Sequence, residues 1–141
     1  MSERYLIDNS AMQRWAKPLV AAVLDDLQER GRLAICGPVE MEIMYSARND
    51  SEARFLHRRL LGFDYLSTPD EVWDRATEIQ REAIRKGFHR ALSMPDLLIA
   101  ATAERHGATV LHYDQDYDMI ASLTGQPTQW VVSSGTADSR G

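Results

Sequence analysis

Short apolar runs alternate along this chain with longer stretches in which polar and apolar positions are mixed. The short runs, such as "YLI", "LAIC" and "ATVL", lack polar residues at alternate positions, which predicts strands that are buried on both faces. We expect five strands, of which the third is the weakest, at residues 4–8, 32–36, 63–67, 108–113 and 128–132.

The stretches between these runs have the spacing of helices. In "PLVAAVLDDLQERG" the apolar residues fall at positions 19, 20, 23, 24 and 27, so one face of a helix is apolar. Pro18 suits the first turn of this helix and Gly31 its C-terminal cap. Further helices are expected at residues 9–16, 38–48, 50–62, 69–87, 93–107 and 116–125.

Two of these helices carry specific start signals. Asn9 or Ser10 can cap the helix that follows the first strand, and Thr68 with Glu71 matches a capping box that opens the long helix after Pro69. The sequence therefore predicts the starting positions of these two helices in addition to their presence.

Strands that alternate with helices predict an α/β sandwich with a short, mainly parallel central sheet. A chain of 141 residues is long enough to form one domain with its own core. We place this domain at residues 1–132 and expect the small, polar segment at 133–141, "SSGTADSRG", to be a disordered tail.

Composition adds little to this picture. The apolar fraction of 44% and the charged fraction of 26% are ordinary for a globular protein. No apolar run is long enough to cross a membrane, and "MSERYLID" lacks the order of a signal peptide. Cys36, the one cysteine, is interpreted as a small buried residue. With neither a disulfide nor an export signal, the expected location is the cytoplasm.

The net charge of −5 argues at first against a nucleic-acid partner. If a cation neutralised five of the acids, however, 16 acids would face 16 lysines and arginines. Only Lys17 and Lys86 are lysines, and the forked donors of arginine suit phosphate. A general bias in composition explains the arginines equally well.

Acidic residues stand where the predicted strands end. Asp8 ends the first strand, and Asp114 and Asp116 follow the run "ATVLHY". Glu42 lies one turn into the helix after the second strand, and Asp96 begins the apolar helix "DLLIAATA". Since functional groups gather at the carboxyl ends of parallel strands, four distant segments can bring acids to one edge of the sheet.

Such a cluster needs a cation, because several carboxylates repel one another and their pKa values rise. Ligands that are all oxygen suit Mg²⁺ or Mn²⁺. The scattered histidines and the single cysteine do not have the spacing of a zinc site.

Each acid also has a simpler interpretation. Asp8 can cap the next helix, and Asp96 can form a capping box with Ser93, although the apolar helix behind it indicates burial. Glu42 shares a helix face with Val39 and Ser46, while the nearby Glu40 points elsewhere, and either glutamate can be solvated surface. The acid at position 118 is interpreted as a first-turn acid that the helix dipole favours.

Four segments together resemble a known family. In order from residue 4 to about residue 132, "YLIDNSAM", "CGPVEMEIMYSAR", "MPDLLIAATAERHGATVLHYDQDYDMIA" and "TGQPTQWVV" are similar to the PIN-domain ribonucleases of the VapC toxin type. The resemblance implies a PIN-like α/β/α fold and an Mg²⁺-dependent endoribonuclease, the toxin of a type II toxin–antitoxin system. It also implies inhibition by a VapB-type antitoxin, a homodimer, an RNA substrate and no membrane.

The resemblance assigns roles to individual residues. Asn9 stands where threonine is common, and His112 where threonine or serine often precedes the last acids. We interpret His112 as a strand-end side chain, with orientation of the following acids or contact with RNA as alternatives. By position, the catalytic and metal-binding acids are Asp8, Glu42, Asp96 and Asp114, the auxiliary ligand is Asp116, and the hydroxyl residue that positions the site is Ser10.

In the implied reaction the metal lowers the pKa of a water, which attacks the phosphorus in line, and a second ion about 3.5–4 Å away can stabilise the leaving oxygen. Arg14, Arg48 or Arg90 can hold phosphates, although solvated surface explains each of them too. A set of large apolar residues belongs either to the core or to a groove for the antitoxin, namely Met12, Trp15, Met41, Met44 and Tyr45.

Three rival functions remain. A non-catalytic PIN-like domain that binds RNA or protein is disfavoured by the complete set of acids. A phosphatase- or receiver-like domain is disfavoured because phosphatases carry D-x-D where this chain has Asp8-Asn9-Ser10. A metal-independent ribonuclease using His89 and His112 would leave cyclic phosphates, whereas metal-dependent hydrolysis is expected to leave 5′-phosphate ends.

Overall fold

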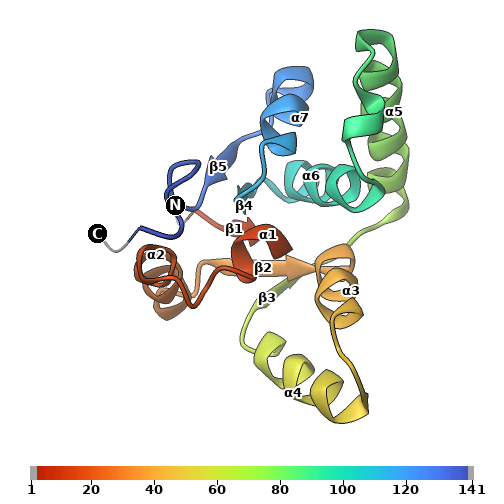
Figure 1. The fold of residues 1–141 in the computed structure, drawn as a ribbon. Helices are drawn as coiled ribbons and strands as arrows, with labels where there is room; N and C mark the ends of the chain where they lie inside the picture. The colour runs from red at the N-terminus through yellow and green to blue at the C-terminus, as the bar shows by residue number, and fades with distance from the viewer. Residues whose placement is uncertain (1–2, 140–141) are drawn as a thin grey trace.

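The computed structural model describes residues 3–139 and contains a five-stranded sheet flanked by helices (Figure 1). All four strand pairs are parallel, which confirms the predicted α/β fold. In sheet order the strands are β3 (Asp64–Leu66), β2 (Leu33–Cys36), β1 (Tyr5–Ile7), β4 (Thr109–His112) and β5 (Thr128–Trp130).

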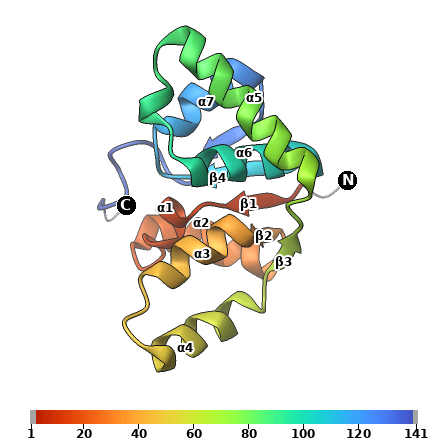
Figure 2. The same cartoon turned by 90° about the vertical axis from the view of Figure 1, so that its right-hand side faces the viewer.

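Within residues 3–139, seven α-helices connect and flank these strands, and all seven were predicted from the sequence, with ends that differ by a few residues. A short 3₁₀ helix, η1 (His89–Ala91), was not predicted. Figure 2 shows α4 at one end of the molecule and α5 and α7 at the other. In chain order the helices are α1 (Asn9–Met12), α2 (Pro18–Glu29), α3 (Gly37–Tyr45), α4 (Asp50–Leu60), α5 (Asp70–Lys86), α6 (Met94–His106) and α7 (Asp116–Thr124).

The central strand β1 brings distant segments together. Tyr5 is in register with Leu33 of β2 on one side and with Thr109 of β4 on the other. Just after β1, the backbone N–H of Asp8 donates to the carbonyl of Leu111 at 2.9 Å. Because the strands are parallel, the segments that follow β1 and β4 leave the sheet side by side.

Helix α6 is buried along most of its length. Residues 96–103 are all buried, and β2 and β4 are buried at every position. This agrees with the sequence, since a helix that is apolar on every side needs protein around it. The acid in its first turn, Asp96, is therefore carried into the interior of the molecule.

The start signals expected for α1 and α5 differ from the caps in the structure. Asp8 caps α1, rather than Asn9 or Ser10, because its carboxylate accepts the backbone N–H of Ser10. Thr68 does not cap α5, whose N-cap is Pro69 without a side-chain hydrogen bond. The hydroxyl of Thr68 lies 3.5 Å from that of Thr102 in α6 instead, so a tertiary contact replaces the predicted local one.

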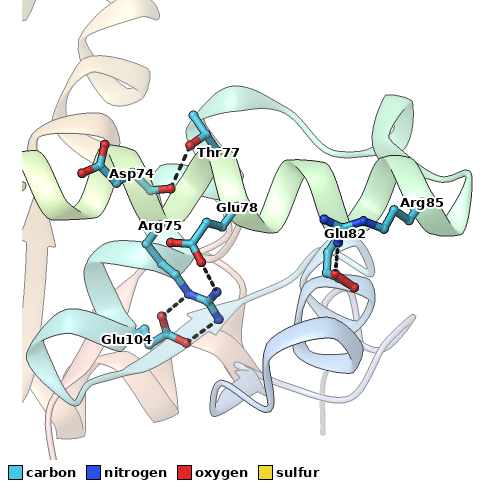
Figure 3. Close-up of polar contacts among 7 residues, drawn as sticks. All are labelled: Asp74, Arg75, Thr77, Glu78, Glu82, Arg85 and Glu104. Carbon is cyan, nitrogen blue, oxygen red and sulfur yellow. Dashed lines mark hydrogen bonds and ion pairs between the residues drawn. The ribbon is translucent and has the colours of Figure 1, made fainter.

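Polar contacts hold α5 against the C-terminal half of α6 (Figure 3). The guanidinium of Arg75 donates to both carboxylate oxygens of Glu104, at 2.7 and 3.2 Å, and lies 3.6 Å from Glu78. Within α5, the Thr77 hydroxyl donates to the Asp74 carbonyl at 2.8 Å. Forked pairing of this kind fixes the orientation of two helices as well as joining them.

The described part of the predicted tail, residues 133–139, contacts the domain. Ala137 is buried, and its N–H donates to the Tyr113 hydroxyl at 3.2 Å. Lys17 forms an ion pair with Asp138 at 2.6 Å. The end of the tail, 140–141, lies outside the described residues, and both the boundary at 132 and the disorder of the tail stay predictions.

Between residues 3 and 139, every helix is too short or too polar to cross a bilayer.

Candidate metal centre

Five acids from four segments meet at the end of the sheet where β1 and β4 stop. Carboxylate oxygens of Asp96, Asp114 and Asp116 lie within 4.8 Å of one another. Glu42 lies close enough to this group for the charges of Asp96 and Asp114, together with that of Asp8, to act on it. The charge of Asp8 acts on Asp96 as well. The structure thus brings together all five acids that the sequence selected.

Asp8 has two functions in the fold. Its side chain is 3% exposed, with Oδ2 accepting the Ser10 N–H at 2.9 Å and Oδ1 accepting the Tyr117 hydroxyl at 2.8 Å. The simple interpretation of Asp8 as a helix cap is confirmed, and the capping acid also lies in the acidic cluster.

Asp96 is 7% exposed at the start of α6. Its backbone N–H donates to Ser93 Oγ at 3.2 Å, so Ser93 caps α6 as predicted. Burial, followed by the charges of Asp8 and Asp114, raises the pKa of Asp96 to about 7, although hydrogen bonds from Ser93 and Tyr117 act in the opposite direction. The carboxylate is thus held in a place where it is unfavourable without a cation.

Glu42 and Glu40, two residues apart on α3, face different surroundings. Burial, followed by the charges of Asp8, Asp96 and Asp114, raises the pKa of Glu42 to about 7. Its Oε1 is buried and has no hydrogen-bond partner among the described residues. Glu40 instead lies 3.6 Å from His57 of α4. Only Glu42 therefore offers an oxygen to the cluster.

The turn after β4 separates the three aspartates of "HYDQDYD". The carboxylate of Asp114 accepts the Asp116 N–H at 2.9 Å, and burial and the charge of Asp114 raise the pKa of Asp116. Asp118 points away from this pair, since its carboxylate oxygens accept the Trp130 indole N–H, both at 3.3 Å. Asp118 lies in the first turn of α7, as predicted, outside the acidic cluster.

Ser10 joins the two strand ends. Its Oγ accepts the backbone N–H of Tyr113 at 2.9 Å, and its own N–H donates to Asp8. The hydroxyl therefore fixes the turn after β4 against the start of α1, which is a positioning function.

Tyr117 is a site residue whose hydroxyl the sequence reasoning missed. The side chain is fully buried, and its hydroxyl lies 2.8 Å from Asp8 Oδ1 and 3.2 Å from Asp96 Oδ1. Burial and the neighbouring carboxylates raise its pKa, so the hydroxyl keeps its proton. Tyr117 directly follows Asp116 in the sequence, but this position gives no sign of a contact with Asp8 and Asp96.

His112 also supports the site. It is fully buried, so it cannot contact RNA, and its Nδ1 accepts the Asp114 N–H at 3.1 Å. Burial lowers its pKa, which favours the neutral ring that this bond requires. Orientation of the Asp114 backbone is thus the alternative that the structure supports, and a metal-independent mechanism through His112 is disfavoured.

The predicted phosphate contacts differ in their distance from the cluster. Arg14 donates to the Ser10 carbonyl at 2.7 Å and lies over the Tyr113 ring, beside the site. Arg48 is exposed and paired with Glu52, and Arg90 is exposed in η1. A phosphate contact stays a prediction for each of them.

The acidic cluster fits a hard divalent cation. Carboxylates dominate it, burial and neighbouring charges raise the pKa values of Glu42, Asp96 and Asp116, and one oxygen of Glu42 lacks a partner in residues 3–139. A cation that prefers oxygen would bind that oxygen and remove the repulsion.

An apolar groove of about 830 Å³ runs from the cluster along α3. Its lining residues include Glu42 of the cluster and Asn9, which follows Asp8 in the sequence. Of the five apolar residues with an open assignment, Met12, Trp15 and Met44 pack against the core, whereas Met41 and Tyr45 are 75% and 93% exposed in the groove. The other large apolar residues of the groove are Tyr65, Trp73 and Met94.

Sequence comparisons place the chain in a family. The PIN domain model matches residues 5–123. Ribonuclease VapC21 of Mycobacterium tuberculosis is 50% identical over 138 residues, which cover 97% of this chain and 100% of the relative. Ribonuclease VapC51 of the same species is 42% identical over 98% of this chain and 100% of the relative.

Solved structures show the same fold at low identity. VapBC2 from Rickettsia felis, bound to a DNA fragment from its promoter, matches with a TM-score of 0.73 and 16% identity, over 89% of this chain and 96% of that one. A toxin–antitoxin complex from Klebsiella pneumoniae matches with a TM-score of 0.70 and 18% identity, over 91% and 98%. Together, the family match and the close relatives show that this chain belongs to the PIN domain family and, within it, to the VapC ribonucleases.

Proposed function

We propose that this VapC ribonuclease is the toxin of a type II toxin–antitoxin system and cleaves RNA internally with Mg²⁺, for which Mn²⁺ can substitute. The observation that carries the proposal is the convergence of five buried or half-buried acids, one of which, Glu42, has a buried oxygen without a partner in residues 3–139. In this proposal Asp8, Glu42, Asp96 and Asp114 bind the cation, and Asp116 assists.

When bound, the cation lowers the pKa of a water and neutralises charge on the phosphate. The part of the protein is to hold the acids in place, and a bound cation would favour their deprotonated form. Asp96 enters on the capped end of the buried α6, and Asp114 is fixed by His112 and by the N–H of Asp116. Ser10 keeps the two strand ends together. Because these bonds exist before RNA arrives, little rearrangement is needed to form the site.

Cleavage of a fluorescent RNA tests this proposal. With Mg²⁺ or Mn²⁺ the chain is expected to produce fragments with 5′-phosphate ends, and EDTA or Asp8→Asn is expected to abolish the reaction. Activity that survives both EDTA and Asp8→Asn would overturn the metal-dependent mechanism.

A matched pair of variants on α3 tests the ligand assignment. Glu42→Gln keeps the size of the side chain and removes its charge, so we expect cleavage to fall at least about 100-fold. Glu40→Gln makes the same change two residues away and is expected to leave cleavage unchanged, because Glu40 lies beside His57. The reverse outcome would reassign the ligand to Glu40.

The apolar groove supports the proposal that a VapB-type antitoxin inhibits the chain. Exposed large apolar side chains that gather in one place mark interaction surfaces, and an amphipathic helix fits such a groove. Tyr45, Trp73 and Met94 are 93%, 50% and 66% exposed in this groove. Since Glu42 lines the same groove, a segment bound there would cover the acids. The solved toxin–antitoxin complexes have this fold.

A homodimer is a separate proposal, which the molar mass in solution tests.

A further inference from the structure

The hydroxyl of Tyr117 contacts two of the acids at once. It lies 2.8 Å from Asp8 Oδ1 and 3.2 Å from Asp96 Oδ1. Asp8 follows β1 and Asp96 lies in the first turn of α6, so one phenol oxygen joins two segments that are far apart in the sequence. A phenol has a single proton, and the shorter contact indicates that this proton is donated to Asp8.

The ring of Tyr117 has little freedom to move. It is fully buried and packs against the ring of His112, with 4.9 Å between the ring centres. The backbone N–H of Tyr117 donates to the carbonyl of Asp114 at 3.2 Å. The position of the hydroxyl is therefore set by the turn that also carries Asp114.

Packing alone does not explain the hydroxyl. A phenylalanine would fill the same space between α7 and β4, without the cost of removing a hydroxyl from water. That cost is offset here by the hydrogen bond to Asp8 and the contact with Asp96, two carboxylates that are unfavourable neighbours unless a donor or a cation lies between them.

We propose that the Tyr117 hydroxyl is a positioning group, which fixes the Oδ1 atoms of Asp8 and Asp96 relative to each other so that their remaining lone pairs face the cation. This inference rests on the proposed metal site. Groups that orient metal ligands typically contribute about 10- to 100-fold to metal affinity. Without the hydroxyl, both carboxylates can rotate, and cation binding has to order them.

The test is Mn²⁺ binding to the full chain after removal of metal with EDTA, measured by calorimetry and by the electron paramagnetic resonance signal of free Mn²⁺. Tyr117→Phe is expected to bind Mn²⁺ about 10-fold more weakly than the unmodified chain. The matched control is Tyr113→Phe, which removes a hydroxyl that accepts the N–H of Ala137 and does not touch the acids. This control is expected to keep the original Mn²⁺ affinity.

Thermal unfolding separates positioning from a purely structural function. A positioning group predicts that Mn²⁺ raises the Tm of Tyr117→Phe by less than it raises the Tm of the unmodified chain. If Tyr117→Phe lowers the Tm by the same amount with and without Mn²⁺, and binds Mn²⁺ normally, the hydroxyl is structural and the inference is wrong.

The unmodified chain and Asp8→Asn distinguish a failure of this inference from a failure of the proposed function. If the unmodified chain binds Mn²⁺ more tightly than Asp8→Asn, the metal site stands whatever Tyr117→Phe shows. If the two bind Mn²⁺ equally, the metal site is wrong at Asp8, and the inference about Tyr117 is wrong with it.

Discussion

At the scale of single residues, the fold places carboxylates close together in sites shielded from water, where their ionised forms are unfavourable without a cation. Burial and neighbouring charges raise the pKa of Glu42 from 4.5 to about 7 and that of Asp96 from 3.8 to about 7. The folded chain therefore holds protons that the unfolded chain has already released at the same pH. Perturbed acids of this kind are typical of functional sites.

This difference predicts how stability depends on pH in the absence of metal. Between about pH 5 and 7 the unfolded chain has lost the protons of Glu42 and Asp96 and the folded chain still binds them, so stability falls as the pH rises through this window. The Tm in EDTA is expected to decrease from pH 5 to pH 8.

Saturating Mg²⁺ and the variant Glu42→Gln serve as controls for this prediction. Both remove the penalty for ionising Glu42, so the decrease in Tm is expected to be smaller in each case. A Tm in EDTA that is constant or rises from pH 5 to pH 8 would contradict the raised pKa values.

At the scale of elements, α6 links the core to the site. Its apolar residues bury it, its capped first turn carries Asp96, and its last turn is joined to α5 through Glu104. The position of Asp96 thus depends on the packing of the whole helix, because the buried apolar residues of α6 fix where its first turn lies.

The cap of α6 gives an element-scale prediction. Ser93→Ala removes the acceptor for the Asp96 N–H and is expected to lower the free energy of unfolding by about 1 kcal/mol. Ser122→Ala is the control, since that exposed hydroxyl bonds only to the Met119 carbonyl of its own helix, and it is expected to change stability by less than about 0.5 kcal/mol.

Urea unfolding in EDTA measures both serine variants without a contribution from metal binding. Equal effects of Ser93→Ala and Ser122→Ala would show that the cap contributes nothing specific to α6.

At the scale of the whole molecule, one parallel sheet creates both the acidic cluster and the groove. Because β1 lies between β2 and β4, the acids after β1 and β4 come close to α3, which follows β2. The same α3 carries Glu42 toward the acids and Met41 and Tyr45 into the groove. A partner that covers the groove can therefore block the acids without contacting all of them.

The groove gives a prediction about the antitoxin. Trp73→Ala removes a half-exposed aromatic side chain from the groove, and we expect it to weaken binding of the cognate VapB-type antitoxin by about 2 kcal/mol, or roughly 30-fold. Phe55→Ala is the matched control, because Phe55 is similarly exposed but lies on α4 and does not line the groove. Calorimetry with the purified antitoxin measures both variants.

Light scattering distinguishes the antitoxin from a second copy of this chain. If Trp73→Ala lowers the molar mass from a dimer to a monomer and leaves antitoxin affinity unchanged, the groove is a dimer contact and the antitoxin binds elsewhere.

The order and type of the main elements, and the acids at the strand ends, could be predicted from the sequence. Strands that are buried on both faces, and a helix such as α6 that is buried on every side, have uninterrupted apolar sequences that can be recognised locally. The alternation of strands and helices indicates a parallel sheet. The five acids could be selected because parallel strands end at one edge of the sheet. Most of the fold and the membership of the acidic cluster were therefore predictable.

The contacts that those residues make depend instead on how the helices and strands pack against one another. Glu42 and Glu40 are both helix glutamates, and it is the packing of α3 against α6 and α4 that directs one to the acids and the other to His57. Thr68 contacts α6 instead of capping α5. The Tyr117 hydroxyl contacts Asp8 and Asp96 because three segments that are far apart in the sequence come together there. The local pattern of apolar and polar residues does not predict contacts between distant segments.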